Sequence, residues 1–294
     1  MFQIKNIQNT IIITDSITES YAKILLNLGG SLQELILDDK QIIKNLKPLS
    51  YDNSFSSAIL FPFTCRIKNG NYLFNNNEYH LELNENNENA LHGLVYNKKF
   101  KVVTQETTTD FASITLIYEE TQKPKGFPFN FKLFLVYTLS HSSLNLEVKV
   151  INSDLTSFPF AIGWHPYFYS SDLFNSFLDF SSSKKLVFDD KMIPIKIDEI
   201  SPINKKIQIK NTKFDDCYII NYKNLNFETP AYSINISSSS NENYFQLYTP
   251  NKINTIAIEP MTGPANSFNN KFGLKVLKPN KTYQLNWKIK LIKL

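Results

Sequence analysis

The sequence predicts an all-β protein, built as a large antiparallel sandwich or a barrel, and two observations lead to that fold class. Apolar and polar residues alternate over 144–150 and 283–291, which puts one face of each segment on a core and the other in water. No window longer than about ten residues carries a helical apolar stripe with caps, so strands follow one another without intervening helices. Further segments rich in β-branched and aromatic residues lie at 11–14, 32–37, 111–119, 131–139, 218–220, 244–248 and 255–259.

Polar, turn-prone stretches separate these segments and are expected to form loops. None of them is long enough to be an interdomain linker, and no internal repeat is present, so residues 1–294 are expected to form one β domain. This length is large for a sandwich, so long loops or extra strands are also expected. The expected loops lie at 68–71, 75–77, 84–90, 181–185 and 237–243.

The composition argues against several classes of protein. The formal charge is 31 basic minus 27 acidic residues, or +4, and no basic tract concentrates it, so no nucleic-acid partner is expected. No apolar run approaches the roughly 18 residues of a spanning helix, and the first residues lack the apolar core of about 7–15 residues of a signal peptide. We therefore expect a cytoplasmic protein with no membrane partner, either a monomer or a homodimer.

The two cysteines, Cys65 and Cys217, are too few for a disulfide scaffold. Their default interpretation is a pair of small buried thiols, although a disulfide between them stays open at this point.

Arg66 is the only arginine among the 31 basic residues, and it follows the rigid sequence Phe61-Pro-Phe. In a sequence that uses lysine almost everywhere, a lone arginine indicates a position where lysine will not serve. The guanidinium group has a planar fork of donors that an ammonium group lacks. Two roles are open for it, a structural ion pair with a carboxylate or a bidentate clamp on substrate oxygens.

Four segments break the alternating pattern and gather the scarce residue types. Each resembles a rigid turn at the end of a strand, and loops held on a rigid scaffold commonly carry binding and catalytic groups. These segments are 61–67, 89–93, 163–168 and 258–269.

Glu259 and the histidines are the candidates for acid and base chemistry. Glu259 follows the apolar run Thr-Ile-Ala-Ile and precedes a proline, so we expect it at the end of a buried strand. Desolvation there raises a carboxylate pKa and makes a better base, but such a carboxylate could equally cap the following turn. His165 and His92 are either acid–base groups or packing residues. His80 and His141 have no special neighbours and are assigned structural roles.

Asp215 and Asp216 form an acidic pair that enters an apolar strand, where one carboxylate could orient substrate hydroxyls. Two histidines and a glutamate also suit iron or zinc, but the close spacings H-x-H and H-E-x-x-H are absent. The glycine-rich nucleotide motifs are absent as well.

Taken together, these segments resemble the aldose 1-epimerase (galactose mutarotase) family over nearly the whole chain and in the expected order. The most specific signatures are His-Pro-Tyr-Phe at 165–168 and Glu-Pro-(x)3-Pro-Ala-Asn at 259–266. Supporting segments lie at 28–35, 61–66, 91–93, 127–129, 163–164, 214–216 and 268–269.

The resemblance implies a large antiparallel β-sandwich of the galactose mutarotase type, with a sugar in an open cleft and no metal or organic cofactor. It implies that Glu259 is the base that takes the proton of the C1 hydroxyl and that His165 is the acid that protonates the ring oxygen. The two groups exchange roles when the ring closes. Arg66, His92 and Asp215 are similar to the family's sugar-binding groups.

The function expected from this resemblance is the interconversion of the α and β anomers of a free hexose such as galactose or glucose. One alternative is a hexose-6-phosphate 1-epimerase, which needs additional cations for the phosphate, a task that lysines would perform here. The other is a sugar-binding protein that has lost catalysis.

Overall fold

The computed structural model describes residues 1–292, and antiparallel strands form nearly all of its regular structure. The described part of the chain contains two helices, α1 (Tyr51–Ser54) and α2 (Ser267–Asn270), each a single turn. Every segment that the alternation singled out lies within a strand. The all-β fold class is therefore confirmed.

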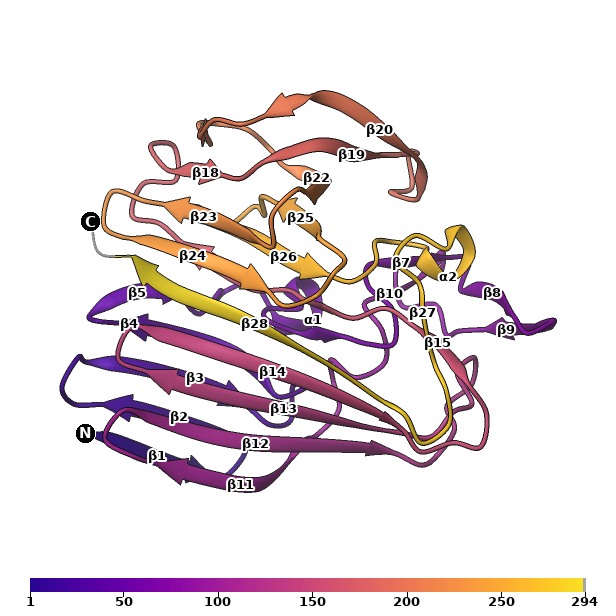
Figure 1. Ribbon diagram of the computed structural model, residues 1–294, viewed down its shortest axis with the longest axis horizontal. Helices are drawn as coiled ribbons and strands as arrows, with labels where there is room; N and C mark the ends of the chain where they lie inside the picture. The colour runs from indigo at the N-terminus through magenta and orange to yellow at the C-terminus, as the bar shows by residue number, and fades with distance from the viewer. Residues whose placement is uncertain (293–294) are drawn as a thin grey trace.

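A nine-stranded antiparallel sheet forms one large face of the molecule and runs from bottom to top in Figure 1. The C-terminal strand lies in its middle and joins an earlier set of hairpins to a later one. In spatial order the sheet contains β11 (Lys101–Thr107), β12 (Phe111–Glu120), β13 (Phe131–Ser140), β14 (Ser143–Asn152), β28 (Thr282–Ile292), β24 (Ser233–Ser238), β23 (Asn224–Glu228), β18 (Phe177–Asp179) and β21 (Ile207–Gln208).

A five-stranded meander of the N-terminal residues packs against this sheet. The hydroxyl of Tyr137, in β13, donates a 2.8 Å hydrogen bond to the carbonyl of Gly30, just before β4, and so joins the two layers. The strands follow one another in sequence order: β1 (Phe2–Ile7), β2 (Thr10–Asp15), β3 (Ser20–Leu25), β4 (Ser31–Leu37) and β5 (Lys40–Ile43).

An eight-stranded sheet brings together the middle and the C-terminal part of the chain. In spatial order it contains β20 (Pro194–Ile203), β19 (Ser182–Phe188), β22 (Asp215–Ile220), β25 (Tyr244–Tyr248), β26 (Thr255–Met261), β16 (Gly163–Trp164) and β6 (Ile59–Leu60), with β17 (Tyr167–Tyr169) also paired to β26. Three small pairs complete the fold: β7 (Arg66–Lys68) with β10 (Asn89–Leu91), β8 (Asn71–Phe74) with β9 (Asn77–His80), and β15 (Phe158–Phe160) with β27 (Lys275–Leu277).

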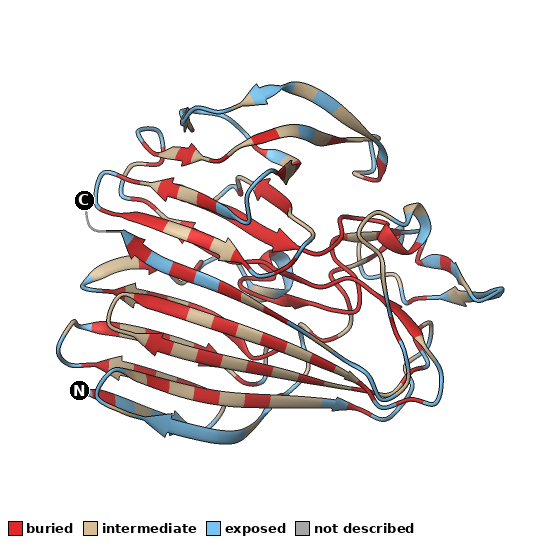
Figure 2. Cartoon of the chain, in the orientation of Figure 1, coloured by how far each residue is buried: buried red, intermediate tan, exposed pale blue. Residues whose placement is uncertain are grey.

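The main hydrophobic core lies between these sheets and includes residues from Phe2 to Leu291, and smaller buried clusters accompany it. In β13 buried and half-buried residues alternate over its whole length, and the same stripes are visible along the neighbouring strands in Figure 2. Trp164 of β16 stacks on Trp287 of β28 with ring centroids 6.1 Å apart, which joins the eight-stranded and nine-stranded sheets. Each fully buried side chain of this size contributes on the order of 1.5–3 kcal/mol.

One expected loop is a strand instead. The stretch 181–185 is not a loop, because Ser182 begins β19 and the strand continues through both lysines. Its polar residues are compatible with a strand because β19 lies near the exposed edge formed by β20. No helix within residues 1–292 has the length and apolar character needed to cross a membrane.

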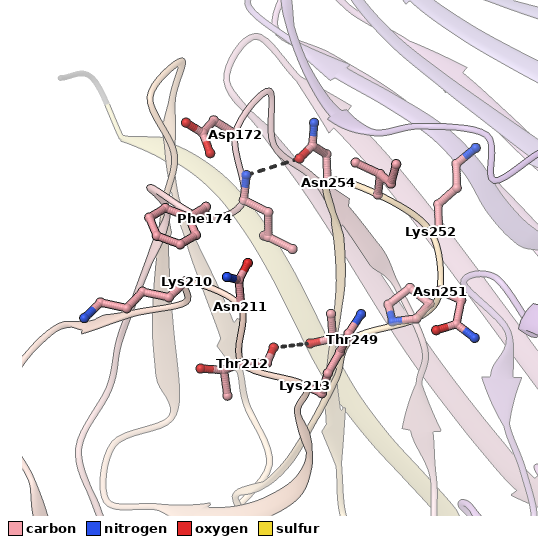
Figure 3. A pocket seen from close by; sticks show the side chains of 13 residues that line it. Asp172, Phe174, Lys210, Asn211, Thr212, Lys213, Thr249, Asn251, Lys252 and Asn254 are labelled. Atoms are coloured by element: carbon pink, nitrogen blue, oxygen red, sulfur yellow. Dashed lines mark hydrogen bonds between the residues drawn. The ribbon is translucent and has the colours of Figure 1, made fainter.

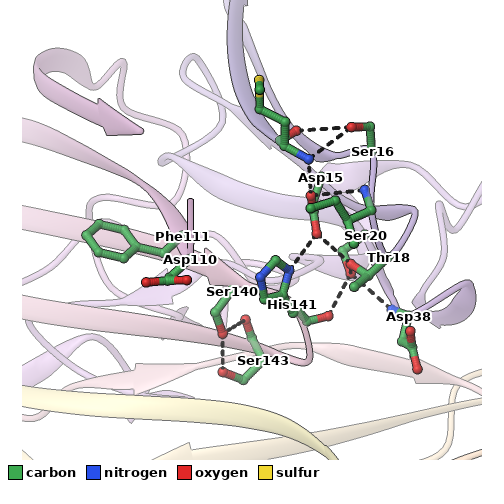
Figure 4. A network of polar contacts seen from close by, with 12 residues as sticks. Asp15, Ser16, Thr18, Ser20, Asp38, Asp110, Phe111, Ser140, His141 and Ser143 are labelled. Carbon is green, nitrogen blue, oxygen red and sulfur yellow. Dashed lines mark hydrogen bonds and ion pairs between the residues drawn. The ribbon is translucent and has the colours of Figure 1, made fainter. Parts of the chain in front are cut away.

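His141 has a specific partner, contrary to the expectation that it lacks special neighbours. Its Nδ1 lies 2.7 Å from Oδ2 of Asp15, a side chain with no exposed surface (Figure 4). Burial raises the pKa of Asp15, but hydrogen bonds from the amine of Met1, His141 and the amide of Ile17 outweigh it and hold the pKa well below its ordinary value. Asp15 therefore ties the N-terminal meander to the β13–β14 turn.

Replacement of this carboxylate should destabilise the protein. We expect Asp15→Asn to lower the free energy of unfolding at pH 7 by about 1–3 kcal/mol, because buried donors lose a charged acceptor. A depressed pKa stabilises the fold above the ordinary value of about 3.9, and this contribution is lost as the pH falls through the folded-state value. The difference between variant and wild type should therefore shrink below about pH 4 in urea unfolding curves. Asp110→Asn, at an exposed position nearby, is the control; equal midpoints for both variants would contradict this role.

Candidate active site

A pocket of about 270 Å³ opens beside β26, β25 and β22 of the eight-stranded sheet, and we call it the central pocket. Its walls come from parts of the chain that are far apart in sequence. They include the segment between β6 and β7, the loop before and after β10, and the connection from β16 to β17. All five residues singled out from the sequence line it: Arg66, His92, His165, Asp215 and Glu259.

Glu259 lies inside β26, which continues through Pro260 to Met261, rather than at the end of a strand. Pro260 is accommodated within the sheet, facing Phe245 of β25. His165 directly follows β16, whose Gly163 pairs with Met261. A Cβ at Gly163 would come within 2.9 Å of the Met261 and Thr64 side chains. The close approach of β16 to β26, and with it the approach of His165 to Glu259, therefore depends on this glycine.

Glu259 and His165 form a buried pair. His165 Nε2 lies 3.4 Å from Glu259 Oε1, and the two residues are only 5% and 2% exposed. Burial lowers the pKa of His165 to about 4. Burial, followed by the charge of Asp215, raises the pKa of Glu259 well above its ordinary value, while Arg66 opposes that rise. Because each separate charge is disfavoured, the pair holds one proton between its two groups near neutral pH.

Each member of the pair also has a second polar atom without a protein partner. These atoms are Nδ1 of His165 and Oε2 of Glu259, and neither makes a hydrogen bond to another described residue. A buried polar atom left unpaired is costly, so such atoms are rare in folded proteins. These two atoms leave hydrogen-bonding capacity beside the pocket that no described residue fills.

His92 belongs to a row of four rings. It packs between Phe55 and His165, with ring centroids 4.6 Å and 5.2 Å away, and His165 stacks on Tyr167 at 4.9 Å. Burial, the neighbouring His165 and Arg66 all hold the pKa of His92 well below its ordinary value, so the ring is neutral. Its Nδ1 is another buried atom without a partner among the described residues.

Backbone contacts hold the turn that carries His92. The His92 amide donates to the carbonyl of Cys65, and the amide of Leu94 donates to that of Phe61. Gly93, between them, has a φ of +77° and lies so close to the Phe61 carbonyl that a Cβ would clash with it. The backbone conformation of this turn and its contact with Phe61 therefore explain why a glycine follows His92.

Arg66 makes the structural ion pair that the sequence left open, and it also lines the central pocket, while its role as a clamp on substrate oxygens stays a prediction. Its Nε lies 3.0 Å and 2.9 Å from the two carboxylate oxygens of Glu85, and one terminal nitrogen lies 2.6 Å from Oε1. Asn89 donates to Oε2 of Glu85 and steadies that carboxylate. This arrangement fixes one edge of the guanidinium fork and leaves the other nitrogen outside the ion pair.

Strand alternation separates the two aspartates. Asp215 lines the central pocket and accepts a 2.7 Å hydrogen bond from Gln246 Nε2. Asp216 turns away and pairs with Lys185 at 2.8 Å. Burial raises the pKa of Asp215, and the charge of Arg66 opposes it. Of the two carboxylates, Asp215 is therefore the one that faces the site.

Several pocket residues were not singled out from the sequence. Gln246 offered a signal, because it is a polar residue in the otherwise apolar and aromatic strand β25. Glu85 offered none, since it lies in the asparagine-rich stretch that reads as an ordinary loop. Its importance follows only from its contact with Arg66.

Cys65 and Cys217 are both buried free thiols. Burial raises the pKa of each thiol, so neither is a reactive thiolate near neutral pH. Within residues 1–292 no group of three or more His, Cys, Asp or Glu side chains is arranged to hold a metal ion.

The family model described as aldose 1-epimerase matches residues 13–290. The chain belongs to the aldose 1-epimerase family. The chain is similar in sequence to the uncharacterized protein YihR of Escherichia coli K12, with 24% identity over 281 residues that cover 92% of this chain and 90% of that protein.

Solved structures share the fold of this family member. A galactose mutarotase-like protein from Clostridium acetobutylicum superposes with a TM-score of 0.86 at 21% identity, covering 100% of this chain and 99% of that one. The galactose 1-epimerase of Lactobacillus acidophilus NCFM superposes with a TM-score of 0.82 at 18% identity, covering 99% and 98%. The galactose mutarotase-like β-sandwich expected from the sequence is therefore confirmed.

The ion pair leads to a prediction about Arg66. Arg66→Lys should weaken the binding of a ligand in the central pocket, because an ammonium group cannot pair with Glu85 through two nitrogens and still present another donor. Glu85→Gln should also weaken binding, because the guanidinium group of Arg66 would lose the carboxylate that holds it in place. We expect KM to rise about tenfold for each, with a smaller change in kcat, in steady-state mutarotation assays. Lys196→Arg, on the exposed edge strand β20, is the charge-preserving control. Wild-type kinetics in Arg66→Lys would show that the lone arginine has no special task.

Proposed function

We propose that this protein is an aldose 1-epimerase that interconverts the α and β anomers of a free hexose such as galactose or glucose. The observation that carries the proposal is the Glu259–His165 pair. It combines a carboxyl group and an imidazole whose nearest polar atoms lie 3.4 Å apart, both buried in one pocket. Anomer exchange requires one proton to be removed and one to be delivered, which such a pair can do.

In the proposed reaction Glu259 takes the proton of the C1 hydroxyl while His165 gives a proton to the ring oxygen. The C1–O5 bond breaks, and its electron pair stays on O5. The electrons of the former O–H bond form the C1 carbonyl. The C1–C2 bond then rotates, O5 attacks the other face of the carbonyl, and each proton returns by the reverse path.

This sequence keeps the net charge of the pair at zero. Before ring opening the pair is a carboxylate and an imidazolium, and afterwards it is a carboxylic acid and a neutral imidazole. A buried site tolerates both states better than one with a net charge, because desolvation penalises isolated charge. The directions of the two pKa shifts favour the carboxylic acid and the neutral imidazole, so the shared proton has to pass from Glu259 to His165 before ring opening.

The remaining pocket residues support binding of a hydroxyl-rich ligand. Asp215 and Gln246 offer a carboxylate and an amide, His92 offers a neutral imidazole, and Arg66 offers the part of its fork outside the Glu85 ion pair. We infer that these groups orient the sugar hydroxyls so that C1 and O5 lie at the Glu259–His165 pair.

The charge balance of the pocket favours a free sugar over a sugar 6-phosphate. Among the described residues that line the central pocket, Arg66 is the only lysine or arginine, and Glu85 already neutralises it. A phosphate would have to be bound there without an uncompensated cation. The presence of both acid–base groups likewise favours an enzyme over a sugar-binding protein that has lost catalysis.

The proposal predicts that the protein accelerates the optical-rotation change of freshly dissolved α-galactose or α-glucose. Glu259→Gln should lower kcat by about 10²–10⁴-fold, because the amide cannot accept the C1 proton. Glu106→Gln, at an exposed position on β11, removes the same charge outside the pocket and should leave the rate unchanged. Polarimetry against a buffer control measures all three proteins. Failure of the wild type to exceed the buffer rate with either hexose would refute the proposal, and full activity in Glu259→Gln would refute the role of the base.

The shared proton also predicts the pH dependence of kcat/KM. Below the His165 pKa of about 4, the pair gains a second proton and loses its base, so activity should fall as the pH drops through that value. Above the raised pKa of Glu259 the pair loses its proton and its acid, so activity should fall again at higher pH. Polarimetric rates corrected for the spontaneous reaction at each pH test this profile. An acid limb near 6.5, the ordinary histidine value, would contradict the effect of burial on His165.

A further inference from the structure

The tip of the β19–β20 hairpin forms part of the wall of the central pocket, and the reaction proposed above gives it no role. Phe188, the last residue of β19, and Met192, between the two strands, both line the pocket. Both residues are half-buried. The hairpin lies at one edge of the eight-stranded sheet, at the top of Figure 1. It therefore adds an apolar surface to a pocket whose acid–base and binding groups come from other elements.

Hydrogen bonds within the tip hold Met192 in a defined turn. The Asp189 carboxylate accepts hydrogen bonds from the amides of Lys191 and Ile193, at 3.0 Å and 2.9 Å. The Met192 amide donates to the carbonyl of Asp189. Met192 has a φ of +58°, in the left-handed region, so these bonds rather than its own preference fix the backbone. The thioether side chain is thus presented to the pocket from an ordered turn.

An ion pair ties this tip to the loop that carries Glu85. Lys191 Nζ lies 3.2 Å from Glu88 Oε2, and each of the two side chains is 51% exposed. The Glu88 amide donates to the Glu85 carbonyl, and Glu85 holds the guanidinium group of Arg66. The hairpin tip and the arginine therefore border the pocket as parts of one connected edge.

The order of the strands separates the tip from the acid–base pair. Glu259 lies in β26, and both β25 and β22 lie between β26 and β19. Neighbouring strands are about 4.8 Å apart, so β22, which carries Asp215, is on the order of 10 Å from β26. A pyranose ring with C1 and O5 at the Glu259–His165 pair that extends toward Asp215 directs its opposite edge, the C3–C4 bond, toward the hairpin tip.

An apolar wall at this edge can distinguish the two configurations at C4. An equatorial C4 hydroxyl projects outward along the ring edge, whereas an axial hydroxyl stands on a face of the ring and leaves a C–H at the edge. A thioether and a phenyl ring offer no strong hydrogen-bond partner. An equatorial hydroxyl placed against them gives up its hydrogen bonds to water, which is unfavourable, and a C–H group has none to give up.

We propose that Met192 is a specificity-determining residue that discriminates between hexose epimers at C4, favouring the axial hydroxyl of galactose over the equatorial hydroxyl of glucose. This inference rests on the proposed epimerase function. The ion pair between Lys191 and Glu88 positions Met192 and does not contact the sugar. C2 is bonded to the reacting carbon, on the side of the ring away from the tip, so Met192 does not discriminate between epimers at C2.

Met192→Gln tests the inference, because the new side chain is similar in length and its amide can donate and accept hydrogen bonds. Polarimetry gives kcat/KM for glucose, for galactose, which differs from glucose only at C4, and for mannose, which differs only at C2. The wild type should prefer galactose to glucose. In Met192→Gln the galactose-to-glucose ratio should fall about fivefold or more, while the mannose-to-glucose ratio stays within about twofold. Met192→Leu, which remains apolar, should keep both ratios.

The ion pair provides a second measurement. Lys191→Glu and Glu88→Lys each bring like charges together and should lower the galactose-to-glucose ratio about twofold or more. The double variant, which restores the pair with its charges reversed, should recover the ratio. Lys210→Glu makes the same charge change in the surface hollow of Figure 3, which shares no residue with the central pocket, and should have no effect. A ratio that fails to recover in the double variant would contradict the positioning role.

The outcomes separate this inference from the proposed function. If the wild type accelerates no hexose, the epimerase proposal itself fails. If it accelerates hexoses but prefers glucose, or if Met192→Gln and Met192→Leu change the galactose-to-glucose ratio equally, Met192 does not discriminate at C4. An equal fall in kcat/KM for all three sugars would overturn the inference in the same way. Thermal unfolding identifies any loss of folding in Met192→Gln, in which case Met192→Ser provides a smaller polar side chain for the same comparison.

Discussion

The buried contact between Glu259 and His165 is the constraint on which the rest of the site depends. Both groups are so deeply buried that a lone charge on either one would have a large desolvation cost. They can be buried together because, as a pair, they hold one proton and carry no net charge. Their separation is set by the close approach of β16 to β26 at Gly163. A small displacement of either strand would separate the groups and prevent proton transfer between them. The chemistry of the site and the packing of the sheet are therefore linked through one backbone contact.

The other polar groups of the pocket follow a common arrangement, in which a protein partner holds one side of the group and leaves another side toward the pocket. Glu85 holds Arg66, Gln246 holds Asp215, and aromatic rings hold His92. This arrangement limits the side-chain freedom that a ligand would otherwise have to restrict on binding. It also compensates the charge of Arg66, so that the pocket is suited to neutral hydroxyl groups rather than to an anion.

The β-sandwich holds these contacts in place. It brings together residues from distant parts of the sequence and restricts their mobility. The strands β22, β25 and β26 lie side by side, and their pairing brings Asp215, Gln246 and Glu259 to one face. Arg66 begins β7, which pairs with β10, and the turn that carries His92 is bonded through its backbone to Cys65 and Phe61.

The sequence by itself determined the strands and the scarce residues of the site. The period of two in segments such as 144–150 and 283–291 is a local property that burial of one face imposes, and the tight turns around His92 and His165 require particular residues. Only the tertiary structure decided that Glu85 holds Arg66, that Asp215 rather than Asp216 faces the pocket, and that His141 pairs with Asp15. These three facts depend on which side chains meet across more than ten residues of chain, and nothing in the local composition of an asparagine-rich loop or an acidic pair specifies that meeting. The pairing of strands and the packing of sheets bring such groups together, and their pKa values follow from that environment.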